Sequence, residues 1–125
     1  MINELNISIW ERTFSLPVEY DCYDDEVVTD SQKSAVKMLI MHPEWITSAK
    51  MQVERFCREE VLKDCENNKK DNIFSYVKPE CLFVKHEAKP RVAIMCKYRY
   101  DPEHGLAVVF FADGRIAVGS QDIIL

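Results

Sequence analysis

Glycine, basic charge and long apolar runs are all scarce in this sequence, and each scarcity excludes a class of protein. The three glycines, at positions 105, 114 and 119, all stand at predicted turns. They cannot form a glycine-rich phosphate loop, so nucleotide binding by backbone amides is disfavoured. The net charge of −5 argues against a general nucleic-acid binder. No apolar run approaches the roughly 18 residues that span a bilayer, so we expect no membrane segment.

Paired cysteine motifs are also missing. The five cysteines are odd in number and none has C-x-x-C spacing. Met1 to Trp10 lacks the basic segment and long apolar core of a signal peptide. We therefore expect reduced thiols in a cytoplasmic protein, most of them filling the core. Because no histidine spacing is typical of a metal centre, we predict no metal, no cofactor and no catalytic residue.

The composition that remains is that of one folded domain spanning residues 1–125. It is 47% apolar and 30% charged, which is too apolar for a disordered chain. A chain of this length buries about two-thirds of its unfolded surface and needs no disulfide or metal to fold.

The first half of the chain predicts a hairpin and then two helices. Leu5 to Trp10 alternates, Thr13 to Tyr20 is also strand-like, and Glu11-Arg12 between them predicts a tight turn. Pro17 cannot donate a ladder hydrogen bond, so it predicts an edge strand or a bulge.

Helix signals follow the hairpin. Thr29 and Gln32 have capping-box spacing, and a helix is predicted from there to about Met41. Pro43 is suited to the first turn of a second helix, for which the apolar spacing continues to about Asn68.

The second half of the chain predicts strands. Arg91 to Tyr100 alternates, and Leu106 to Phe111 is apolar on both faces, which predicts burial on both sides or a partner on one. Asp113-Gly114 is typical of a two-residue hairpin turn. The order β-β-α-α-β-β-β-β predicts an α+β fold, with a mainly antiparallel sheet and two helices packed on one face.

The turn from Asp101 to Gly105 carries the most reactive side chains. Pro102 and Gly105 suit a turn, and Asp101 can accept hydrogen bonds from nearby backbone amides, so the structural interpretation is favoured. The alternatives are a protein contact, or chemistry in which Asp101, Glu103 and His104 act as metal ligands or as acid and base.

Two further groups are candidates for binding a partner. Asp24, Asp25 and Glu26 form an acidic loop, which is either a solvated loop or a surface for a basic partner. Tyr98 and Tyr100 either pack on the sheet or anchor an interaction patch with an acidic rim.

The motif around this turn resembles a family of small bacterial domains of unknown function. The resemblance rests on Tyr98-x-Tyr100 before Asp101-Pro102-Glu103-His104-Gly105, then on Asp113-Gly114 and Gly119-Ser120-Gln121-Asp122. Such domains are similar in setting to immunity-type proteins of bacterial toxin systems. The resemblance implies binding and names no catalytic residue.

We therefore expect a non-enzymatic protein-binding domain, immunity-like, that occludes a basic toxin or another basic partner. The candidate contacts are Asp24, Asp25, Glu26, Tyr98, Tyr100, Asp101, Glu103 and His104. One alternative is a hydrolase or metal-binding protein that uses Asp101, Glu103 and His104. Another is a structural homodimer subunit that buries Leu106 to Phe111.

Overall fold

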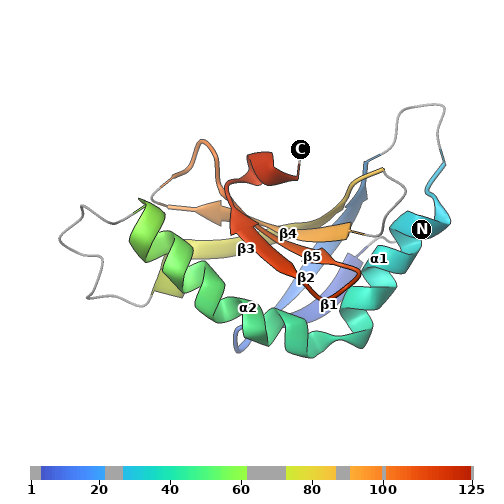
Figure 1. Ribbon diagram of the computed structural model, residues 1–125, viewed down its shortest axis with the longest axis horizontal. Coiled ribbons are helices and arrows are strands. Elements are labelled where there is room, and N and C mark those ends of the chain that lie inside the picture. The colour runs from blue at the N-terminus through green and yellow to red at the C-terminus, as the bar shows by residue number, and fades with distance from the viewer. Residues whose placement is uncertain (1–3, 22–26, 62–72, 87–90, 100, 125) are drawn as a thin grey trace.

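One six-stranded sheet organises the part of the chain that the structure describes, which is residues 4–21, 27–61, 73–86, 91–99 and 101–124 of a computed structural model (Figure 1). The strands are β1 (Glu4–Ile9), β2 (Arg12–Tyr20), β3 (Val77–Val84), β4 (Arg91–Tyr98), β5 (Leu106–Phe111) and β6 (Ile116–Gly119). They lie in chain order across the sheet. All neighbours are antiparallel except β2 and β3, which are parallel. The predicted α+β class with a mainly antiparallel sheet is confirmed.

Two α-helices, α1 (Asp30–Met41) and α2 (Pro43–Arg55), stand between β2 and β3. The predicted capping box is present: the Gln32 backbone N–H donates to Thr29 Oγ1, and the Thr29 N–H donates to Gln32 Oε1. The predicted element order is approximately right. It lacked three short helical segments, namely a π-helix at Phe56–Val61 and 3-10 helices at Ile73–Tyr76 and Gln121–Ile123.

The second helix differs from its prediction. Instead of one α-helix to Asn68, the α-helix ends at Arg55 and a π-helix continues to Val61, beyond which residues 62–72 lie outside the described parts. Cys57, the second residue of the π-helix, is fully buried like Val53 four residues before it. Periodicity alone does not distinguish such a turn from an α-helix.

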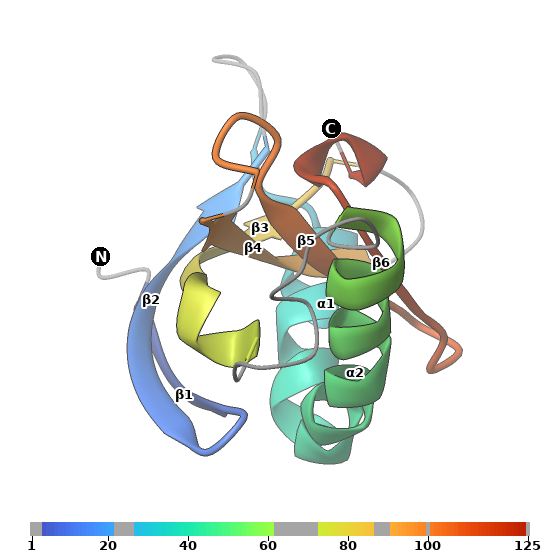
Figure 2. The same cartoon turned by 90° about the vertical axis from the view of Figure 1, so that its left-hand side faces the viewer.

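The β1–β2 hairpin turns one residue earlier than predicted (Figure 2). Trp10 and Glu11 form the turn, with positive φ values of 49° and 71°. The Trp10 ring lies against α2, where its Nε1–H donates to the Ile46 carbonyl at 3.0 Å. Arg12 begins β2, and its guanidinium donates to the Phe74 and Val77 carbonyls.

Pro17 lies in an internal strand and in a regular β1–β2 register, so neither predicted alternative, an edge strand or a bulge, describes its position. Arg12 to Pro17 pair with β1, whereas Val18 to Tyr20 pair with β3. Pro17 therefore stands where β2 exchanges one neighbour for the other, and its missing N–H is tolerated there.

Both helices cover the same face of the sheet (Figure 1), as predicted. Val92, Ile94, Cys96 and Tyr98 point to this face from β4, in agreement with the predicted alternation.

The opposite face has a smaller apolar cluster, built on Ala93, Met95, Ala107 and Val109. The C-terminal segment folds over it (Figure 1) and Ile124 is fully buried in it. β5 is therefore buried on both sides, as predicted, and other parts of the same chain cover both of its faces. No helix among the described residues has the length and apolarity to cross a bilayer.

The β5–β6 hairpin is present, but its loop is longer than the predicted two residues. The Phe111 N–H donates to the Arg115 carbonyl, which leaves three residues in the loop, with Gly114 at φ 90°. Asp113 favours this form because its carboxylate accepts from the Arg115 backbone and guanidinium.

Candidate functional site

The turn between β4 and β5 is held by Asp101. Its carbonyl accepts from the Gly105 N–H at 2.8 Å, and its Oδ1 accepts from the His104 N–H at 3.3 Å. Gly105 supplies the positive φ, 63°, that the turn needs. These contacts agree with the structural interpretation, and they hold the exposed Glu103 and His104 in place.

Gln121 ties this turn to the C-terminal segment. Its backbone N–H donates to the His104 carbonyl at 3.0 Å, and its Nε2 donates to the Cys96 carbonyl at 3.1 Å. A Cβ on Gly105 would lie 2.6 Å from Gln121 Nε2, so the two residues fit only because position 105 is glycine. The turn is thus fixed both by its own hydrogen bonds and by those from Gln121.

Acidic groups surround His104. The His104 Nδ1 lies 3.0 Å from Asp101 Oδ1, with both side chains partly exposed. This hydrogen bond raises the pKa of His104, and the negative charges of Asp101, Glu103 and Asp122 act in the same direction. Within the residues that the structure describes, no group of three His, Cys, Asp or Glu side chains could hold a metal ion.

The predicted aromatic and acidic contacts have different outcomes. Tyr98 is 1% exposed in the helix-facing core, so it is not an exposed contact. Its hydroxyl is near Cys57 and acts to lower the pKa of that thiol. Tyr100 and the loop residues Asp24, Asp25 and Glu26 lie outside the described residues.

Three cysteines can be assessed as nucleophiles. Burial raises the pKa of Cys57 to about 11, against a smaller opposing effect of Tyr98. Burial also raises the pKa of Cys81 to about 11, and it raises the pKa of Cys96. Burial therefore favours the protonated form of these thiols, and Cys57 and Cys96 lie in the helix-facing core, as predicted for most of the cysteines.

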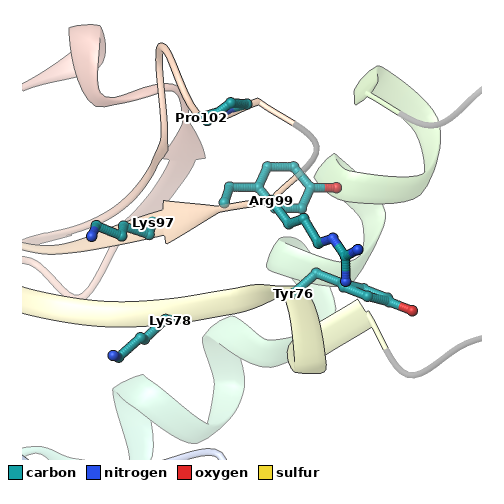
Figure 3. A pocket seen from close by; sticks show the side chains of 6 residues that line it. Tyr76, Lys78, Lys97, Arg99 and Pro102 are labelled. Atoms are coloured by element: carbon teal, nitrogen blue, oxygen red, sulfur yellow. The ribbon is translucent and has the colours of Figure 1, made fainter.

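A cavity of about 460 Å³ opens beside the turn, at the end of β3 and β4 (Figure 3). It is lined by Tyr76, Lys78, Lys97, Tyr98, Arg99 and Pro102. Pro102 belongs to the turn itself, so the cavity and the turn are adjacent. Three of the six lining residues are cations, in a chain whose net charge is −5.

The cavity residues escaped the sequence prediction, apart from Tyr98. The predicted alternation does place Lys97, in β4, and Arg99, directly after β4, on one face. However, Lys78 joins them only through the β3–β4 register, in which Lys78 is paired with Lys97. A bulge between Pro79 and Cys81 sets that register, and the alternation pattern does not reveal it.

Arg99 is positioned by Tyr76. The Arg99 N–H donates to the Tyr76 carbonyl at 3.0 Å, and the guanidinium carbon lies 5.6 Å from the centre of the Tyr76 ring. This is a cation–π contact, and Figure 3 shows the guanidinium over the ring.

Comparison with known proteins gives one match. The sequence profile of a family described as a domain of unknown function (DUF6985) matches residues 2–125. No curated protein and no solved structure is significantly similar to the chain.

Proposed function

The chain belongs to this family of domains of unknown function, and on that premise we propose that it is a non-enzymatic domain that binds a protein partner at the end of β3 and β4. The observation that carries the proposal is the cavity of about 460 Å³ beside a braced turn. Cavities of this size are typical of ligand sites. A turn already fixed by hydrogen bonds loses little conformational entropy on binding.

The charges on the turn indicate the charge expected of the partner. Asp101, Glu103 and Asp122 act on the pKa of His104, and we call them the acidic border of the turn. A basic group on the partner would complement this border, as the sequence predicted. Rim charges of this kind act chiefly on the rate of association and on specificity.

The specific form of the proposal is an immunity-like protein of a bacterial cytoplasm that occludes a basic toxin. Its support is the resemblance carried by Asp101-Pro102-Glu103-His104-Gly105 and the net charge of −5, which would speed the encounter with a basic partner. The acidic loop of Asp24, Asp25 and Glu26 would add to that attraction.

Affinity capture from native lysate, with and without a chelator, tests the proposal. The Glu103→Lys variant reverses one charge of the acidic border, and Glu11→Lys reverses an exposed charge on the distant β1–β2 turn. We expect the wild type and Glu11→Lys to capture one stoichiometric partner, and Glu103→Lys to lose it. The chelator should not change the capture. A partner retained equally by both variants would remove the acidic turn from the interface. Bound metal with no partner would favour the metal-binding alternative instead.

A further inference from the structure

We infer that the cavity at Lys78, Lys97 and Arg99 binds the carboxylate of an acidic side chain, carried by an extended segment of the partner with an apolar residue beside it. The inference rests on the proposed binding function and adds the chemistry of the bound segment. It concerns basic residues that the predicted acidic surface does not include.

The first support is an unbalanced positive charge. Lys78 and Lys97 are directly paired across the antiparallel strands β3 and β4, and Figure 3 shows their side chains extending in the same direction. Like charges in this position destabilise a sheet. Glu80 Oε2 lies 3.4 Å from Lys97 Nζ and offsets one of these charges. In the described part of the chain, neither Lys78 nor Arg99 has a carboxylate within ion-pair distance.

The second support is that the side chain of Arg99 is already held in place. Its guanidinium is held against the Tyr76 ring, at 5.6 Å from the ring centre, and its backbone is tied to Tyr76. A planar guanidinium that is already oriented can bind both oxygens of a carboxylate, with less entropy lost on binding. In Figure 3 the two lysine side chains extend away from the Arg99 guanidinium, so a carboxylate bound by Arg99 would gain from the lysines through longer-range attraction.

The residues that line the cavity favour an acidic peptide over other anions. Tyr76, Pro102 and the aliphatic stems of the two lysines offer apolar surface beside the charges. A bare phosphate would leave that surface uncovered. A nucleic acid would need a longer basic stripe than three residues, on a chain with a net charge of −5.

Nuclear magnetic resonance of the full chain, labelled with ¹⁵N, tests the inference with a defined probe. The probe is an acetylated and amidated hexapeptide of alternating glutamate and phenylalanine, and its control has glutamine in place of glutamate. We expect the amide signals of Lys97 and Arg99 to shift and saturate with the glutamate peptide, and to move little with the glutamine peptide or with inorganic phosphate. Equal shifts with glutamine or with phosphate, or no shift at millimolar peptide, would overturn the inference.

Charge reversal supplies the matched control. Lys78→Glu should weaken the peptide about tenfold, because attraction becomes repulsion. Lys37→Glu makes the same charge change on an exposed residue of α1 and should change affinity less than about twofold. If Lys78→Glu and Lys37→Glu weaken peptide binding equally, only the net charge of the protein matters, and the cavity is not the binding site.

If a captured partner is lost by Glu103→Lys but retained by Lys78→Glu, the binding function stands and the cavity inference fails. If the peptide binds the cavity but no partner is captured, the cavity holds and the protein-binding function fails.

Discussion

Gly105 shows how a single residue fixes the site. Its φ of 63° is unfavourable for any residue with a Cβ, and an added Cβ would lie 2.6 Å from Gln121 Nε2 and 2.9 Å from the Cys96 carbonyl oxygen. The second contact is with backbone, so it cannot be relieved by turning a side chain.

We therefore predict that Gly105→Ala lowers the free energy of unfolding by about 2–4 kcal/mol. Gly114→Ala is the matched control. Its φ of 90° is also positive, but the nearest heavy atom to a Cβ there is 3.7 Å away, on Trp45. It should cost about 1 kcal/mol, from backbone strain alone. Urea unfolding of the two variants measures the difference, and equal losses would mean that the contact with Gln121 and Cys96 is relieved.

His104 gives the turn a dependence on pH. The hydrogen bond to Asp101 raises the pKa of His104 above its ordinary value, so the folded state favours the protonated ring. The resulting stabilisation is fully present below the unfolded-state pKa, about 6.5, and is lost as the pH rises through the higher folded-state pKa.

A titration of the His104 ring by nuclear magnetic resonance should therefore give a pKa above about 6.5 in wild type. In Asp101→Asn the pKa should fall back toward that value, since both the charge and the strongest acceptor are lost. Glu103→Gln should lower it less, because Glu103 acts only through its charge. A larger fall in Glu103→Gln than in Asp101→Asn would contradict the observed pairing.

At the scale of elements, the β1–β2 hairpin is closed by unfavourable residues. Trp10 and Glu11 both have positive φ, in a two-residue turn where asparagine and glycine are preferred. Trp10 is retained by its contacts, since it donates to Ile46 and packs on Phe74 with ring centres 5.0 Å apart. Glu11 is exposed, and no side-chain contact of it is evident in the described part of the chain.

Glu11→Asn should accordingly raise the free energy of unfolding by about 0.5–1 kcal/mol, because asparagine tolerates positive φ better. Glu11→Gln removes the same charge without helping the backbone and should be close to neutral. Thermal unfolding of both variants at one pH measures the contrast. A gain of the same size in Glu11→Gln would point to charge rather than to backbone conformation.

The elements also show what the sequence could predict. The start of α1 was predictable because Thr29 and Gln32 are only three residues apart and cap each other locally. The alternation of β4 identified its core face for the same reason, since Val92, Ile94 and Cys96 repeat at a fixed local spacing. Local patterns of this kind need no knowledge of the rest of the chain.

Features that depend on distant segments were not predictable. Gln32 is 1% exposed because its Nε2 donates to the Asp21 and Val84 carbonyls, and Val84 belongs to a strand beyond both helices. The cavity depends on the register that pairs Lys78 with Lys97. Such contacts follow from the assembled sheet, and the same holds for the burial of Tyr98, which local alternation left open between core and patch.

At the scale of the whole molecule, one cluster joins the sheet to both helices. The helix-facing core contains residues from β1 to β5 and from α1 and α2, with Ile116 and Val118 of β6 packed against it. Its two tryptophans report on different parts: Trp10 lies at the β1–β2 turn, and Trp45 of α2 is near Gly114 in the β5–β6 loop.

We predict a single cooperative unfolding transition in urea, with a slope of about 1–3 kcal/mol/M. In Trp45→Phe the remaining fluorescence reports on Trp10 alone, and its midpoint should coincide with the midpoint from far-ultraviolet circular dichroism. Fluorescence that changes at lower urea would show the hairpin detaching before the rest of the molecule unfolds.

The parallel pairing of β2 with β3 bears on how fast the molecule folds. The β1–β2 hairpin and the β3 to β6 strands each join neighbours that are close in sequence, so both can form early. Val18–Tyr20 can meet Leu82–Val84 only after the intervening chain, with both helices, has been closed into a loop. The entropy of that closure precedes any gain from the pairing. We therefore expect this seam of three residue pairs to form late and to limit the folding rate.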